Sequence, residues 1–209
     1  MDIKSLFKKY IVPHEINFVS MLQQQAIAID HMIEDLSSCF IEANQLSCDA
    51  IMEDVHNTKN IKETNMKQLL NAFITPIDRE SIYRTITGLD AISISVKHFV
   101  QETKAYKIHE LSQYRKLFRY IKKGSKKLKL GFEALDKNDH FEVAKLADEV
   151  RKITDKISQE YIKQMVKLAQ LKDVSYMFKH REILFQLKQI GNHLHNAANT
   201  LEDIVIKMD

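Results

Sequence analysis

Hydrophobic positions repeat with a period near 3.6 along most of the chain, which predicts long amphipathic helices. Six such stretches follow one another. The first two run from about residue 13 to 41 and from 44 to 70, and the third begins in the segment FITPIDRE. The fourth runs from about 108 to 135, the fifth starts near Asn138 or Asp139, and the sixth runs from about 176 to 208. The pattern therefore predicts an all-α protein.

Short links between these helices favour antiparallel neighbours, so we expect an up-and-down bundle of about six long helices. Two arrangements fit the pattern: one domain over residues 1–209, or two three-helix halves at 13–106 and 107–209. The 209 residues include only 4 Gly and 2 Pro, too few for the tight turns of a sheet protein.

Local signals suggest where some helices begin and bend. In FITPIDRE, Thr75 can cap the third helix, with Pro76 at its first position and Asp78 at its third. Pro13 suits the first turn of the first helix. Gly124 and Gly131 are points where the fourth helix could bend or break.

The cysteine pattern and the lack of long apolar runs bear on the compartment. Cys39 and Cys48 have no CxxC partner, so we expect no disulfide and a reducing cytosol. No stretch approaches the roughly 20 apolar residues of a membrane span. The segment MDIKSLFKKY lacks the apolar run of a signal peptide. These features predict a soluble cytoplasmic protein.

Charge is concentrated in one segment. The whole chain carries +3, but eight cations and no acid lie between Arg115 and Lys129, so this segment carries +8 and leaves −5 for the remainder. We interpret the segment as a candidate partner-binding or anion-binding surface formed by Arg115, Arg119, Lys122, Lys123, Lys126, Lys127 and Lys129.

Several ligands could suit such a surface: an acidic loop of a transporter, an anionic membrane or phosphate groups. The apolar residues Leu117, Phe118, Ile121, Leu128 and Leu130 are interleaved with the cations. No nucleic-acid recognition motif accompanies the segment, so nucleic acid is not expected. A solvated helix face is the plain alternative and stays open.

Metal sites and catalysis receive little support from the residues alone. In GNHLHNAANT, His193 and His195 are two apart and point to different sides of a helix. Asp49, Glu53 and His56 share one helix face and form a weak alternative metal site. No Gly-rich phosphate loop or GxSxG motif is present, and carboxylate pairs such as Asp30 and Glu34 resemble exposed surface charge. We therefore expect no enzyme activity.

Three segments resemble the PhoU-like phosphate-transport regulators, in the branch associated with Pit-type phosphate transporters. TPIDRESI at 75–82 is similar to the family's TPFDREDI, FVSMLQQQA at 18–26 to FFDLLEEQA, and LHNAANTLEDIVIK at 194–207 to CEDVADVIEGIVLK. The resemblance implies a helical bundle and an accessory role at a transporter.

Some members of that family bind metal clusters through E/DxxxD motifs on facing helices. At the corresponding positions this chain has Val55 and Lys59 on the second helix, and Asp90 with Ala91 and Ile94 on the third. Asp155 follows Arg151 on the fifth, and the last helix has Lys188, Asn192, His195, Asn196 and Asn199. Asp90 and Asp155 would be weak remnants of sites that are largely lost.

The resemblance favours a non-enzymatic accessory protein without a cofactor, which binds a Pit-type transporter at the inner face of the membrane. Two alternatives stay open. One is a PhoU-like protein with a multinuclear carboxylate and histidine site for Fe, Zn or Mn. The other is a helical scaffold that binds anionic membrane or nucleic acid through the basic segment. A homodimer is compatible with each of them.

Overall fold

The computed structural model describes residues 16–108 and 110–208, and these form six long α-helices without a strand. They are α2 (Phe18–Glu42), α3 (Gln45–Asn71), α4 (Arg79–Ala105), α5 (Arg115–Asp136), α6 (His140–Leu168) and α7 (Val174–Met208). A short 3-10 turn, η1 (Ser112–Tyr114), precedes α5. The predicted all-α bundle is confirmed.

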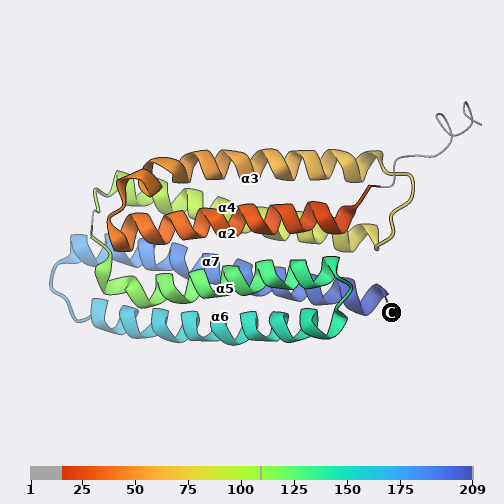
Figure 1. Ribbon diagram of the computed structural model, residues 1–209. Coiled ribbons are helices and arrows are strands. Elements are labelled where there is room, and N and C mark those ends of the chain that lie inside the picture. The colour runs from red at the N-terminus through yellow and green to blue at the C-terminus, as the bar shows by residue number, and fades with distance from the viewer. Residues whose placement is uncertain (1–15, 109, 209) are drawn as a thin grey trace, which may run out of the picture.

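The helices stack in layers, as Figure 1 shows. The central helices α2, α4, α5 and α7 pack on one another through the pairs α2–α4, α2–α5, α4–α7 and α5–α7. Helix α3 lies outside α2 and α4, and α6 lies outside α5 and α7. One cluster of buried side chains draws on all six helices, for example Leu22, Ile51, Leu89, Phe132 and Leu194.

Helix starts follow from capping side chains. Asp78 is the N-cap of α4, and its carboxylate accepts a hydrogen bond from the Ser81 backbone N–H at 2.9 Å. The predicted start with Thr75 as cap and Pro76 in the first turn is therefore wrong by three residues, because Asp78 satisfies the free N–H groups at that end. Asp139 caps α6, one of the two predicted positions. Pro13 lies outside the described residues.

Helix α5 differs from its prediction in two ways. It begins at Arg115 rather than near residue 108. It also continues through Gly124 and Gly131, where a bend or break was predicted. A Cβ at Gly124 would lie 3.3 Å from Leu194 Cδ1, and one at Gly131 would lie 2.6 Å from Leu201 Cδ2. The glycines therefore let α5 approach α7 closely, which explains their presence without a kink.

The expectation of unpaired cysteines is also wrong, because Cys39 and Cys48 form a disulfide. Helix α2 ends at Glu42 and α3 begins at Gln45, so the chain reverses within two residues, with Ala43 in the left-handed conformation at φ 55°. The reversal brings the two Cα atoms within 4.7 Å. The cysteines therefore no longer support the predicted reducing compartment.

Candidate functional site: the basic face of α5

The eight cations of the basic segment cover one side of α5. At about 100° per residue, Arg115, Arg119, Lys123 and Lys126 fall within an arc of roughly 80° and form its crest. Lys122 and Lys129 lie on the side that faces α2, whereas Lys116 and Lys127 lie on the side that faces α6. The structure thus divides the eight cations, of which all but Lys116 were predicted to bind a partner, into a crest and two flanks.

The flank toward α2 is neutralised. Lys129 Nζ lies 3.0 Å from Asp30 Oδ2, and Lys122 Nζ lies 3.8 Å from Glu34 Oε1. Asp30 was interpreted as exposed charge but is only 3% exposed, and its second oxygen accepts a hydrogen bond from Ser125 Oγ at 2.7 Å. The hydrogen bond to Asp30 raises the pKa of Lys129. These two lysines hold α2 against α5.

The flank toward α6 is neutralised in the same way. Lys116 Nζ lies 2.9 Å from Glu160 Oε2, and Lys127 Nζ lies 2.7 Å from Glu149 Oε2. The hydrogen bond from Lys127 is the largest influence that lowers the pKa of Glu149, and the one to Glu160 raises the pKa of Lys116. These ion pairs join α5 to α6, so the charges of the two lysines are already used within the bundle.

The crest remains available to a partner. The side chains of Arg115, Arg119, Lys123 and Lys126 are exposed, and none forms an ion pair with a carboxylate of the described residues. Arg115 donates one hydrogen bond to the Ile41 backbone oxygen at 3.4 Å, close to the end of α2. We call these four residues the cationic ridge.

The apolar residues of the basic segment point away from the ridge. Leu117, Phe118, Ile121 and Leu128 are buried in the core, and Leu130 is partly buried against it. Phe118 packs against Phe99 of α4 with ring centroids 5.8 Å apart. These side chains cannot insert into a membrane while the bundle is intact, so the ridge offers charge rather than an apolar anchor.

The structure brings together the positions that the resemblance assigns to metal on α3 and α4. Val55, Lys59, Asp90 and Ile94 line one cavity of about 480 Å³, together with His56, Lys62 and Lys97. Asp90, the weak remnant, forms an ion pair with Lys62 at 3.5 Å. A lysine ammonium therefore occupies the place beside Asp90 where a cation would lie.

The corresponding positions on α6 and α7 do not converge on one point. Arg151 pairs with Glu202 at 2.7 Å, and Asp155 is exposed. His195 Nδ1 lies 3.0 Å from Thr154 Oγ1 of α6. His193 instead lines a cavity of about 400 Å³ with Arg84 on α4 and with Asn196 and Asn199. The two histidines thus face different helices, as their spacing indicates.

Asp49, Glu53 and His56 do not gather around a common point. Asp49 accepts a hydrogen bond from Gln45 at 2.8 Å, and His56 faces the cavity beside α4. The group whose ligand atoms do converge, among the described residues, is His31 and Asp35 on α2 with Asp54 on α3. The sequence analysis missed this group. The spacing of four between His31 and Asp35 signals a shared face, but only the α2–α3 packing reveals Asp54.

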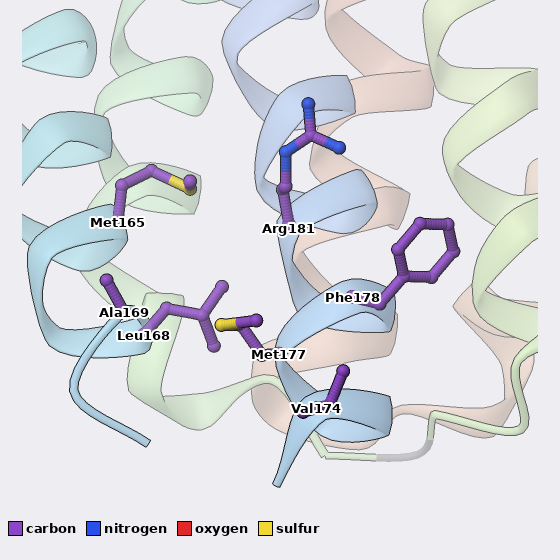
Figure 2. Close-up of a pocket in the computed structure, with 7 residues that line it drawn as sticks. All are labelled: Met165, Leu168, Ala169, Val174, Met177, Phe178 and Arg181. Atoms are coloured by element: carbon purple, nitrogen blue, oxygen red, sulfur yellow. The ribbon is translucent and has the colours of Figure 1, made fainter. Parts of the chain in front are cut away.

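An apolar depression lies between the end of α6 and the start of α7, and Figure 2 shows the side chains around it: Met165, Leu168, Ala169, Val174, Met177, Phe178 and Arg181. Its volume of about 160 Å³ is small beside the roughly 300 to 1,000 Å³ of small-molecule sites. We therefore place no ligand there.

Comparisons with known proteins agree with the fold. The chain is 26% identical to the UPF0111 protein YkaA of Bacillus subtilis (strain 168) over 144 residues, which cover 68% of this chain and 70% of YkaA. No protein-family model matches the chain. In residues 16–108 and 110–208, no helix is both long enough and apolar enough to cross a membrane.

Two solved structures share the architecture. A PhoU-like protein from Shewanella oneidensis MR-1 superposes with a TM-score of 0.76, at 14% identity, over 91% of this chain and 99% of that chain. A PhoU-like phosphate regulatory protein from the same organism superposes with a TM-score of 0.69, at the same identity and coverage. The fold of this chain is that of PhoU-like proteins.

Proposed function

We propose that this chain is a non-enzymatic accessory or regulatory protein of inorganic phosphate transport, which works at the cytoplasmic face of the membrane by binding a Pit-type transporter. The PhoU-like fold, which it shares with a phosphate regulatory protein, supports the phosphate-related role. The TPIDRESI segment, which resembles the TPFDREDI of the PhoU-like regulators, supports the same role. The cationic ridge is the observation that supports binding to the transporter through surface charge.

The ridge suits an acidic protein surface. Its four cations lie on a rigid helix whose flanks are held by ion pairs with α2 and α6, so their spacing is set before a partner arrives. Charge complementarity of this kind steers association and fixes register. Because the apolar side of α5 is buried, a purely lipidic partner would gain electrostatic attraction without an apolar anchor.

The residues at the family's metal positions favour a role in partner binding over the binding of a multinuclear metal cluster there. Lys59, Lys62 and Lys97 line the cavity beside Asp90, and ammonium groups repel a cation. On α6, Arg151 stands four residues before Asp155, where the family has a carboxylate, and pairs with Glu202, so Asp155 lacks a second carboxylate at that position. We therefore propose that neither place holds the family's metal cluster and that this mode of action needs no cofactor.

Charge reversal of the ridge tests the proposal. The variant R115E/R119E/K123E/K126E should lose affinity for a purified Pit-type transporter by roughly tenfold or more, because attraction becomes repulsion. Biolayer interferometry with the transporter in nanodiscs would measure this loss. Lys122 and Lys127 are left intact, since Glu at either position would face Glu34 or Glu149 and disturb the packing of α5.

A matched variant controls for the change in net charge. Lys67, Lys104, Lys167 and Lys172 are exposed, lie outside α5 in the sequence, and form no ion pair within the described part of the chain. Their joint reversal to Glu changes the net charge equally and should leave the affinity close to that of the wild type. Equal losses in the two variants, or no loss in the ridge variant, would contradict the ridge as the binding surface.

A further inference from the structure

A histidine and two carboxylates meet on the surface between α2 and α3. His31 and Asp35 are four residues apart on α2, and Asp54 projects from α3 toward them. His31 Nδ1 lies 3.3 Å from Asp54 Oδ1 and 3.8 Å from Asp35 Oδ2. One ligand atom from each of the three side chains lies within 4.8 Å of the others.

These separations are close to those around a bound transition-metal ion. Zinc takes imidazole nitrogen at about 2.0–2.1 Å and carboxylate oxygen at about 2.0–2.2 Å, so two ligands of a tetrahedral ion lie roughly 3.3–3.5 Å apart. The His31–Asp54 pair already has this spacing, and Asp35 Oδ2, 3.8 Å from His31 Nδ1, would move closer when an ion binds. The three atoms can therefore form three corners of a tetrahedron.

A second observation points to a missing partner. Asp54 Oδ2 is buried from solvent and accepts no hydrogen bond from any described residue. A carboxylate oxygen that has lost water without gaining a donor is costly and calls for an explanation. The other oxygen of this carboxylate, Asp54 Oδ1, faces His31. An ion bound to Oδ1 would neutralise the negative charge that the two oxygens share.

We propose that His31, Asp35 and Asp54 bind one divalent transition-metal ion of the zinc type. The site lies between α2 and α3, whereas the positions that the resemblance assigns to metal lie on the α3–α4 and α6–α7 pairs. His31 is 65% exposed, so the fourth coordination position opens to solvent and takes water or an exogenous ligand. The bound ion joins two helices and stabilises their packing. This site does not depend on the proposed function.

Cobalt and zinc titrations of the metal-free full chain test the site. Co²⁺ should give the visible absorption of a tetrahedral centre that saturates at one ion per chain, and Zn²⁺ should displace it. Zn²⁺ should also raise the melting temperature, because a ligand that binds only the folded state stabilises it. Variants D54N and H31A should each lose the cobalt spectrum and the zinc-dependent rise in melting temperature.

The control is the double variant D49N/H56A, which removes two of the three residues of the weak alternative site on α3 and should keep both signals. Circular dichroism in the presence of a chelator verifies that every variant is folded. Absence of the cobalt spectrum in the wild type, its persistence in D54N, or its loss in D49N/H56A would each overturn the assignment to these three residues.

Discussion

At the scale of single residues, His180 shows how burial changes chemistry in this bundle. Its ring is only 5% exposed, stacks on Tyr176 with centroids 3.9 Å apart, and has Nδ1 within 3.0 Å of the Tyr114 hydroxyl. Burial raises the pKa of Tyr114, so that hydroxyl keeps its proton and stays neutral beside Nδ1. Burial, aided by Lys179, lowers the pKa of His180, so the imidazole is neutral in the fold.

The lowered pKa of His180 predicts a loss of stability in mild acid. Above the ordinary value of 6.5 both folded and unfolded chains keep this side chain neutral, and its contribution is complete. Below that value the unfolded chain gains a proton that the folded chain resists, so the free energy of unfolding falls. Gln at position 180 does not titrate. H180Q should therefore lose less stability than the wild type between about pH 7.5 and about pH 5.5.

Urea unfolding followed by circular dichroism at the two pH values checks this prediction. The difference between the two proteins matters, since other groups titrate in the same range in both. An equal loss in wild type and H180Q would mean that His180 does not contribute to the acid sensitivity.

At the scale of helices, alanine substitutions at two glycines should have opposite effects on stability. Gly88 lies inside α4 with no atom within 4 Å of the position that a Cβ would take. G88A should stabilise the protein by about 1 kcal/mol, because alanine has the higher helix propensity. Gly191 lies inside α7, where a Cβ would meet Ile157 Cγ2 at 2.9 Å and Cδ1 at 3.2 Å. The β-branched Ile157 is stiff and buried, so G191A should cost roughly 1–3 kcal/mol.

Thermal and urea unfolding of the two variants measure these changes side by side. The pair tests the close contact between α6 and α7, because both substitutions add the same methyl group to a helix interior. Stabilisation by G191A comparable to that by G88A would show that the two helices are farther apart than described.

The helices and their number could be predicted because the apolar period is long and seldom interrupted. Their ends were less predictable. Thr75 and Pro76 form a good start signal, yet Asp78 three residues later binds the Ser81 N–H and takes the capping role. Gly124 and Gly131 resemble helix breakers in sequence, and only the approach of Leu194 and Leu201 from α7 explains them.

In the candidate sites, too, the sequence reveals the residue types but not the contacts between helices. A run of eight cations is visible in the sequence, but the acidic partners lie on other helices. The sequence therefore could not separate Lys129, which pairs with Asp30, from Lys126, which pairs with no carboxylate of the described residues. Two features were missed for the same reason. One is the disulfide, and the other is the group formed by His31, Asp35 and Asp54. Each joins α2 to α3, and such pairing depends on the register between two helices.

At the scale of the whole molecule, the bundle presents its charge on a stiff support. Helix α5 lies between α2 and α6 and is joined to both by ion pairs, while its apolar side packs on the core. The ridge is therefore the part of the basic segment that remains for a partner. The proposed function requires that this partner be the transporter rather than the lipid around it.

Binding of the wild-type chain to two kinds of nanodisc tests that requirement most directly. One kind contains a Pit-type transporter, the other only the same anionic lipids, and both are measured at about 0.15 M salt, where charges beyond about 8 Å are largely screened. We expect saturable binding to the transporter discs and much weaker binding to the empty ones. Equal binding to both would contradict the proposed function and assign the ridge to the membrane surface.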